Sequence, residues 1–373
     1  MRNSPDGMEA DRLTLDLSRA NAWFVRNYAD CRDGFLQKAA RFEAVASHRE
    51  WPADVASEPS LVTDTLWLGA ADAKRVLVLI SATHGVEGYC GSAVQQFLLS
   101  QWSPGTVQAW QDTAVLFIHA LNPWGMAHAR RCDAQGIDLN RNFLDFSAAL
   151  PADPDYPELL AALALADVDQ RTRQLTVLRE RWGERRFQQV LSSGQALCDW
   201  APFYCGTAPS RASQVIDTII AEYQLSEREL VVLDLHSGLG PWSHGELICD
   251  HPADSNGQRY AVSLFGKAVA NAGQGESFSV PLNGLQDYRW HALMAERGCF
   301  LTLEYGSYPV EHLFRVLLDD HLYWHQLGKN AADTPQRLAM LEHFCPQDVL
   351  WQQAVLFRGW QYVSRVLEYF GNE

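Results

Sequence analysis

The chain has 373 residues, of which 47% are hydrophobic and 11% aromatic, and its formal net charge is −15 at pH 7. This composition is typical of a globular protein with a substantial core and excludes a disordered chain. The acidic balance, without any block of Lys and Arg, argues against nucleic acid or an anionic membrane as the main partner, because both bind basic surfaces.

Targeting signals and disulfides are not indicated by the sequence. No apolar signal core follows the polar start Met1–Gly7, and no apolar run approaches the length needed to span a membrane. The eight cysteines are scattered and form no Cys-x-x-Cys pair, so we expect reduced thiols and not a disulfide framework. These features predict a cytoplasmic protein.

The N-terminal part of the chain first reads as helical and then alternates strands with helices. Apolar residues at helical spacing predict helix from about residue 14 to 50. Strand and helix patterns then follow over residues 61–68 (strand), 75–81 (strand), 91–101 (helix) and 114–120 (strand). Short connections between such elements predict a parallel or mixed sheet that is covered on both faces.

The second half of the chain contains two helical segments around a further set of strands. Residues 153–195 predict a helical insertion, because they are rich in Leu, Ala, Arg and Glu and interrupt the strands. Residues 310–370 predict a helical tail with a loop near Ala332. Strands are expected between these segments, over 229–236, 247–249 and 299–304. We therefore expect one α/β domain over residues 1–373, a three-layer α/β/α fold with a mixed, largely parallel, twisted sheet.

A potential metal site begins directly after the buried strand 75–81. His84 and Glu87 form a His-x-x-Glu motif flanked by glycines, which let the backbone bend so that both side chains face one point. His236, at the end of another apolar strand, supplies a third ligand. Three ligands with one open position are typical of a catalytic zinc site, so one Zn²⁺ per chain is expected.

Three further motifs also follow or end predicted strands. In open α/β sheets, ligands bind at the carboxyl ends of the strands, so we expect three of the four motifs to converge there. The full set, in chain order, is His84-x-x-Glu87, Asp138-Leu139-Asn140-Arg141-Asn142-Phe143, Asp234-Leu235-His236-Ser237-Gly238 and Thr302-Leu303-Glu304-Tyr305-Gly306.

The residues of these motifs have complementary chemistry. Glu304 is a carboxylate outside the metal set and is the natural general base for a water molecule. Asn140 and Arg141 offer an amide and a planar guanidinium that together hold a carboxylate. An arginine shortly upstream, Arg130 or Arg131, would polarise a carbonyl and stabilise an oxyanion.

The order of the four motifs resembles the zinc carboxypeptidase (M14-like) superfamily, which includes the succinylglutamate desuccinylase and aspartoacylase branch. The resemblance covers about residues 76–306 and implies a mixed sheet of about eight strands between helices. It implies that His84, Glu87 and His236 are the zinc ligands and that Asn140 and Arg141 bind the carboxylate of the substrate. It also implies that Glu304 is the general base and that Arg131 or Arg130 polarises the carbonyl. The family's mobile tyrosine has Tyr288 as its nearest candidate.

One difference and one further similarity concern the branches of this superfamily. The aspartoacylase branch usually carries a small β-rich domain after its catalytic Glu, whereas the tail predicted here is helical. The segment Phe203-Tyr204-Cys205-Gly206 is similar to a poorly characterised subgroup of the superfamily.

Some of these residues also have a structural interpretation. Arg141 could form a structural salt bridge with Asp138 or Asp145. Glu304 could likewise form a salt bridge with an arginine. His244 and Glu246 form a second metal-like pair close to His236.

The sequence thus predicts a zinc-dependent hydrolase that cleaves an amide bond near a free carboxylate. A carboxypeptidase-like peptidase acting on small peptides is the leading hypothesis. An N-acyl amino acid deacylase with the same residues is the alternative, and a non-catalytic metal- or ligand-binding protein is the alternative of another class. No Gly-x-Ser-x-Gly or Gly-x-x-x-x-Gly-Lys motif supports a serine hydrolase or a nucleotide-binding protein.

Overall fold

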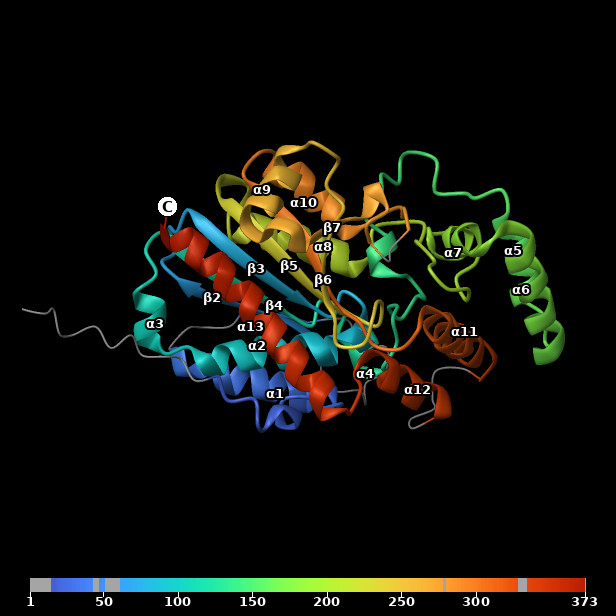
Figure 1. Cartoon of the computed structure of the whole chain (residues 1–373), viewed down its shortest axis with the longest axis horizontal. Coiled ribbons are helices and arrows are strands. Elements are labelled where there is room, and N and C mark those ends of the chain that lie inside the picture. Colours follow the sequence, from blue (N-terminus) through green and yellow to red (C-terminus); the bar gives the residue numbers. More distant parts are fainter. Residues whose placement is uncertain (1–14, 43–46, 51–60, 278–279, 328–333, 373) are drawn as a thin grey trace, which may run out of the picture.

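The computed structural model describes residues 15–42, 47–50, 61–277, 280–327 and 334–372. Within these residues, eight strands form one mixed sheet in the order β1-β2-β4-β3-β5-β8-β6-β7 (Figure 1). The strands are β1 (Ser47–Glu50), β2 (Val62–Gly69), β3 (Arg75–Ser81), β4 (Thr113–His119), β5 (Glu229–Ser237), β6 (Gly245–Cys249), β7 (Val269–Asn271) and β8 (Gly298–Tyr305).

The centre of the sheet is parallel, and its margins are mixed. Strands β4, β3, β5 and β8 run in the same direction, whereas β2 pairs antiparallel with β4 and β6 pairs antiparallel with β8. The carboxyl ends of β3, β5 and β8 therefore meet at one edge. The register pairs His236 of β5 directly with Glu304 of β8, so both side chains lie on the same side of the sheet.

Both faces of the central strands are buried, which explains why these segments are continuous apolar runs. In β3, Leu77 and Leu79 belong to one core, and Val76, Val78 and Ile80 belong to the other. Period-two alternation of apolar side chains therefore supplies both layers of helices with a packing surface.

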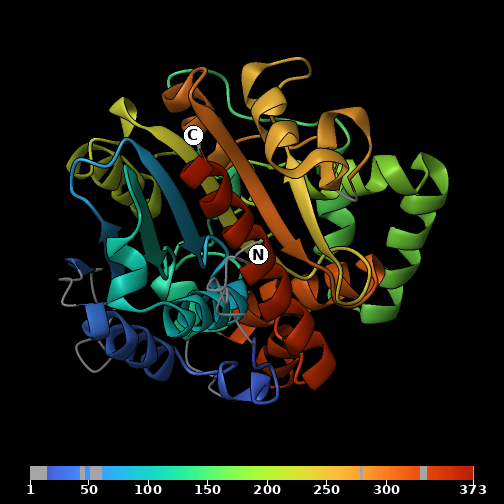
Figure 2. The ribbon, with the colours of Figure 1, turned by 60° about the vertical axis from the view of Figure 1, so that its left-hand side comes forward.

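Helices cover the two faces. The first core contains residues of α1 (Tyr28–Ala39), α2 (Gly88–Gln101) and α13 (Val349–Asn372), whereas the second contains α8 (Arg211–Glu222) and α10 (Gln286–Met294). Helix α9 (Asn256–Phe265) packs against β8 and α13. Figure 2 shows α13 (red) crossing the face of the sheet.

Two groups of helices lie at one end of the molecule, outside the sheet (Figures 1 and 2). The insertion consists of α5 (Tyr156–Leu163), α6 (Val168–Trp182) and α7 (Glu184–Ser192). The tail contributes α11 (Val310–Leu327) and α12 (Pro335–Phe344). The short helices α3 (Pro104–Gln108) and α4 (Pro123–Ala127) belong to neither group: α3 packs against β2 and α4 against α1.

The predicted fold class is confirmed, with helices in both of the predicted helical segments. The helix predicted over about residues 14–50 is wrong at both ends. Residues 15–27 contain turns and the short 3-10 helix η1 (Ala20–Ala22) before α1 begins, and residues 47–50 form a strand. The backbone of this segment pairs antiparallel with β2, so sheet pairing overrides the local apolar spacing. Strand β7 and helices α8 to α10 had not been predicted, and the loop expected near Ala332 lies outside the described residues.

Within the described ranges, no helix combines the length and the apolar character needed to cross a lipid bilayer.

The turn after β3 is fixed by close backbone packing. Ala82 adopts a left-handed conformation with φ of 62°, and the chain then enters the short 3-10 helix η3 (Gly85–Glu87). The backbone amides of Gly85 and Val86 donate to the carbonyl oxygens of Arg131 and Arg130 at 3.1 and 2.9 Å. A Cβ atom on Gly85 would lie 2.1 Å from the carbonyl carbon of Gly125. Only glycine fits here, because the backbone of Gly125 leaves no space for a side chain.

The substitution Gly85→Ala should therefore destabilise the protein by about 1–3 kcal/mol, because two backbone segments would have to separate. Urea unfolding of the metal-free protein measures the effect. Gly273→Ala is the matched control, since a Cβ there meets no atom within 4 Å. Equal unfolding free energies for the two variants would contradict this account of the turn.

Candidate functional site

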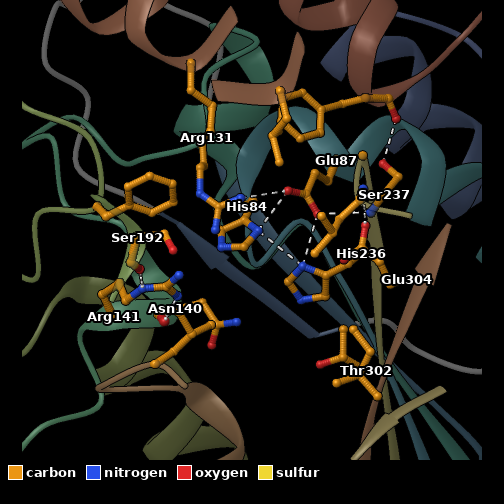
Figure 3. A pocket seen from close by; sticks show the side chains of 18 of the residues that line it. His84, Glu87, Arg131, Asn140, Arg141, Ser192, His236, Ser237, Thr302 and Glu304 are labelled. Atoms are coloured by element: carbon orange, nitrogen blue, oxygen red, sulfur yellow. Dashed lines mark hydrogen bonds and ion pairs between the residues drawn. The ribbon is translucent and has the colours of Figure 1, made fainter. Parts of the chain in front are cut away.

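Two histidines and one glutamate converge at the carboxyl edge of β3 and β5 (Figure 3). His84 and Glu87 come from the turn after β3, and His236 from the end of β5; all three are buried. The Nδ1 atoms of the two histidines are 3.1 Å apart. Glu87 places Oε1 2.8 Å from Nδ1 of His84 and Oε2 3.0 Å from Nδ1 of His236.

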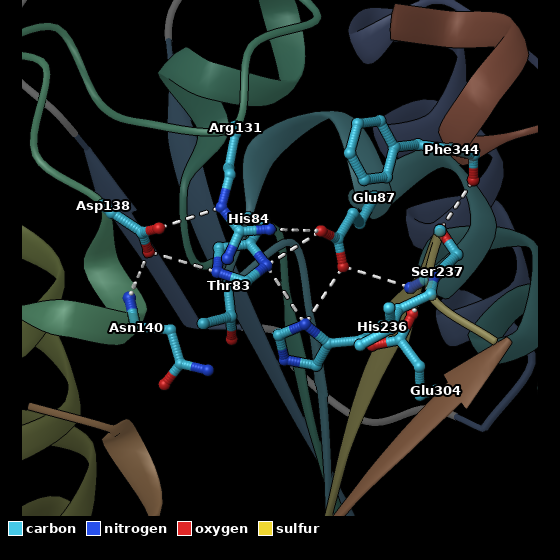
Figure 4. A network of polar contacts seen from close by, with 12 residues as sticks. Thr83, His84, Glu87, Arg131, Asp138, Asn140, His236, Ser237, Glu304 and Phe344 are labelled. Atoms are coloured by element: carbon cyan, nitrogen blue, oxygen red, sulfur yellow. Dashed lines mark hydrogen bonds and ion pairs between the residues drawn. The ribbon is translucent and has the colours of Figure 1, made fainter. Parts of the chain in front are cut away.

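The outer nitrogen of each histidine is held by a buried carboxylate (Figure 4). Nε2 of His84 lies 3.2 Å from Oδ1 of Asp138, and Nε2 of His236 lies 2.8 Å from Oδ2 of Asp234. Such a carboxylate keeps the proton on Nε2 and leaves a lone pair on Nδ1. Two Nδ1 lone pairs and a carboxylate then face one point, a donor set that suits a divalent metal such as zinc.

The charges around this point favour a cation. Burial opposes ionisation, but His84 and His236 hold the pKa of Glu87 well below its usual range. Burial likewise works against Asp138, yet Arg131 and His84 keep the pKa of that carboxyl low. For His236, the neighbouring Asp234 and Glu87 overcome burial and raise the pKa well above its usual range. The carboxylates thus remain ionised and attract positive charge, either as protons or as a metal ion.

Glu304 stands beside this group without belonging to it. Its Oε1 accepts a hydrogen bond from the backbone amide of Leu239 at 3.0 Å, and no arginine forms an ion pair with it among the described residues. Burial, together with the charge of Glu87, raises the pKa of Glu304 to about 8. A carboxyl group in this range can take up and release a proton near neutral pH.

The structure distinguishes Arg131 from Arg130. Arg131 faces the site, where its Nε donates to Asp138 at 2.9 Å and its Nη1 to Glu87 at 3.2 Å. Arg130 instead pairs with the buried Asp320 at 2.8 Å and lies over the ring of Trp324, away from the site.

Asn140 and Arg141 lie across the cavity from the histidines (Figure 3). Arg141 donates from Nε to the carbonyl oxygen of Ser192 at 2.8 Å and from Nη1 to that of Asn140 at 2.6 Å. Burial lowers the pKa of Arg141 to about 10, which leaves the side chain charged at neutral pH. Neither Asp138 nor Asp145 forms an ion pair with it among the described residues, so its charge is available to a ligand.

Three other residues singled out in the sequence, Tyr288, His244 and Glu246, do not line the site cavity. Tyr288 is 41% exposed, and its hydroxyl donates to the carbonyl oxygen of Leu282 at 3.2 Å. His244 is exposed, whereas Glu246 is buried and accepts from Ser277 at 3.3 Å, so this pair does not form a joint ligand set.

We call His84, Glu87 and His236 together the metal group. A cavity connects this group with Arg141, and the space inside it that is open to a water-sized molecule is about 100 Å³. We call it the site cavity. The sheet supplies its floor, while α7 of the insertion and α11 of the tail supply walls. Its lining includes Gln188, Ser192, Phe203, Ile248, Asp250, Val280, Leu282, Thr302, Leu313, Phe314, Leu317 and Phe344.

Phe203 organises the two arginines of the site cavity. Its ring centroid lies 5.3 Å from the guanidinium carbon of Arg131 and 5.4 Å from that of Arg141. Both distances are within the range of cation–π attraction. One aromatic ring therefore helps to hold two positive groups that would otherwise repel each other.

Sequence reasoning missed several of these residues. Asp234 carries a readable signal, because residues two apart on a strand share a face and Asp234 and His236 are such a pair. The role of Asp138 and the walls from α7 and α11 depend on tertiary structure and have no local signal.

The family model described as "Protein of unknown function (DUF2817)" matches residues 24–358, so the chain belongs to that family. A search of curated proteins found no match.

Several solved structures are similar to the chain. Carboxypeptidase A from Helicoverpa armigera is 14% identical over 93% of this chain and 74% of that chain, with a TM-score of 0.49. Bovine thrombin-activatable fibrinolysis inhibitor in complex with tick carboxypeptidase inhibitor is 10% identical (92% and 96% covered, TM-score 0.46). An aspartoacylase family protein from Mesorhizobium loti is 16% identical (78% and 69% covered, TM-score 0.37).

Replacing one histidine of the metal group should abolish metal binding. His236→Ala should reduce bound zinc from about one ion per chain to near zero after dialysis against a weak chelator, because two protein ligands hold a zinc ion less firmly than three. Elemental analysis measures the stoichiometry. His244→Ala, an exposed histidine nearby, should bind zinc like the wild type; unchanged zinc content in His236→Ala would refute the ligand assignment.

The raised pKa of Glu304 predicts a specific pH dependence of stability in the metal-free protein. Between the usual value of 4.5 and about 8, the folded chain retains a proton that the unfolded chain has lost. The free energy of unfolding should therefore fall as pH rises through this window. Glu304→Gln removes the titrating group, so its unfolding free energy should fall less between pH 5 and 8. Parallel pH curves from chemical denaturation would contradict the shift.

Proposed function

We propose that the chain is a zinc-dependent hydrolase that cleaves an amide bond close to a free carboxylate, and that it acts as a carboxypeptidase-like metallopeptidase. The observation that carries the proposal is the convergence of two Nδ1 lone pairs and Glu87 on one point beside a separate buried carboxyl, Glu304. A purely structural metal site closes its coordination with protein ligands, whereas a catalytic one keeps a position open.

His84, Glu87 and His236 would hold the zinc ion. When bound there, zinc polarises a substrate carbonyl and makes a water molecule more acidic. Asp138 and Asp234 support this role, because they fix the orientation of the two imidazole rings from outside.

Glu304 would act as the general base and acid. It removes a proton from the attacking water and delivers a proton to the amide nitrogen as the carbon–nitrogen bond breaks. The products are a carboxylic acid and an amine. The position next to His236 in the neighbouring strand and the pKa near neutrality both favour this proton transfer.

Arg141 and Asn140 would hold the free carboxylate of the substrate. Arg141 is buried, charged and without an ion-pair partner among the described residues, and Nδ2 of Asn140 is a neutral donor next to it. Arg131 lines the site cavity and is bonded to Asp138 and Glu87, where its positive charge would stabilise the oxygen that becomes negative during attack.

Hydrolysis of small N-acyl amino acids is the second candidate function. The insertion and the tail both supply walls, and the space open inside the site cavity is only about 100 Å³. Enclosure of this kind favours a short substrate over a long polypeptide, and a small N-acyl amino acid has the same amide and carboxylate.

Product analysis of a mixed substrate panel tests the proposal. The zinc-loaded protein is incubated with short peptides and N-acyl amino acids, and products are identified by mass spectrometry. Release of C-terminal residues assigns a peptidase, and release of acyl groups assigns a deacylase. Glu304→Gln should keep zinc but lose turnover by about 100- to 10,000-fold, because the proton-transfer group is removed.

The exposed carboxylate of Glu311 on α11 supplies the matched control, and Glu311→Gln should retain activity. Wild-type turnover that persists in Glu304→Gln would remove Glu304 from the mechanism. A zinc-loaded wild type without turnover on either class of substrate would instead support a non-catalytic binding protein.

A further inference from the structure

Gln286, the first residue of α10, is fully buried beside the site and does not line the site cavity. Its side-chain Nε2 donates to Oδ2 of Asp234 at 3.2 Å, the same oxygen that receives Nε2 of His236. The hydroxyl of Thr83 lies 2.9 Å from each of the two oxygens of Asp234 and is a further donor to this carboxylate. Gln286 therefore helps to orient the carboxylate that orients a metal ligand.

The backbone of Gln286 contacts the opposite end of the site. Its amide nitrogen donates to Oδ1 of Asn140 at 2.8 Å. Because this bond uses the oxygen of the Asn140 amide, it fixes which end of that amide is free. The donor Nδ2 is left for a ligand, as a carboxylate clamp requires.

The contacts close into a ring. The backbone amide of Asn140 donates to Oδ1 of Asp138 at 3.0 Å, and the same oxygen lies 3.2 Å from Nε2 of His84. A chain of hydrogen bonds therefore leads from His84 through Asp138 and Asn140 to Gln286. From Gln286 it continues through Asp234 to His236. The histidines complete the ring through their facing Nδ1 atoms.

Burial of Gln286 has no explanation in core packing. Its Oε1 has no hydrogen-bond partner in the described part of the chain, which is costly for a fully buried amide. An apolar residue would fill the same space without that cost. The contacts with Asp234 and Asn140 are what an apolar residue cannot supply.

We propose that Gln286 is a positioning residue that joins the carboxylate clamp to the metal group: its side chain sets the metal affinity through Asp234, and its backbone amide sets the orientation of Asn140. This inference rests on the proposed function, since it assumes that the two groups bind a metal ion and a carboxylate.

Two substitutions at this position separate the two contacts. Gln286→Leu removes the side-chain donor and retains the backbone amide. Gln286→Pro removes both donors, and the position tolerates proline because it is the first residue of a helix and follows Leu285 in an extended conformation. Thr83→Val is the matched control, because it removes another donor to Asp234 without affecting Asn140.

The readouts are the zinc dissociation constant, from competition with a chromogenic chelator, and the affinity of the metal-free protein for succinate, from calorimetry. Gln286→Leu and Thr83→Val should each weaken zinc binding by about 3- to 10-fold, less than the 10- to 100-fold typical when an outer carboxylate itself is replaced. Both should bind succinate like the wild type. Gln286→Pro should weaken zinc binding similarly and succinate binding by about fivefold.

The thermal midpoints of the metal-free variants, expected within a few degrees of one another, show that the losses are local. If the wild type binds zinc and succinate, this inference alone is overturned by either of two results. One is an unchanged zinc affinity in Gln286→Leu, and the other is an unchanged succinate affinity in Gln286→Pro. A wild type that binds no zinc overturns the proposed function as well.

Discussion

The geometry of the site depends on the hydrogen bonds that two buried carboxylates make to the outer nitrogens of two histidines. Without Asp138 and Asp234, each imidazole ring could rotate or carry its proton on the inner nitrogen, and the lone pairs would no longer face one point. The two carboxylates are themselves stabilised by donors, Arg131 for Asp138 and Thr83 for Asp234. The site is therefore preorganised by layers of polar contacts that extend well beyond the three potential ligands.

The parallel sheet provides the frame for this arrangement. Strands β3, β5 and β8 end at one edge, and the register sets Glu304 beside His236. A slip of one residue would turn the side chain of Glu304 to the opposite face, because side chains alternate along a strand. The dense apolar packing on both faces of these strands resists such a slip, so the core and the candidate chemistry are parts of the same constraint.

An element or site residue could be predicted from the sequence where its signal lies in neighbouring residues. The apolar run of β3 and the His-x-x-Glu motif after it are contiguous, so both the strand and the turn were readable. The helical insertion and tail were also readable from composition, whereas β1 was not, because its pairing with β2 is a tertiary contact. Spacing alone could not separate Arg130 from Arg131. Their difference arises from Asp320 on α11, nearly two hundred residues away, which pairs with Arg130 and turns it from the site.

The last part of the site to be synthesised is also tied to its centre. Ser237, next to His236, donates from its hydroxyl to the carbonyl oxygen of Phe344 at 2.6 Å, and Nε2 of His343 lies 2.9 Å from the carbonyl oxygen of Gly238. The strand end that carries a candidate ligand thus reaches its final form only when the end of α12 has docked. During translation, a nascent chain that already contains every candidate ligand and Glu304 still lacks about forty residues of this support. We therefore expect the site to reach its final form only after α12 has left the ribosome and docked.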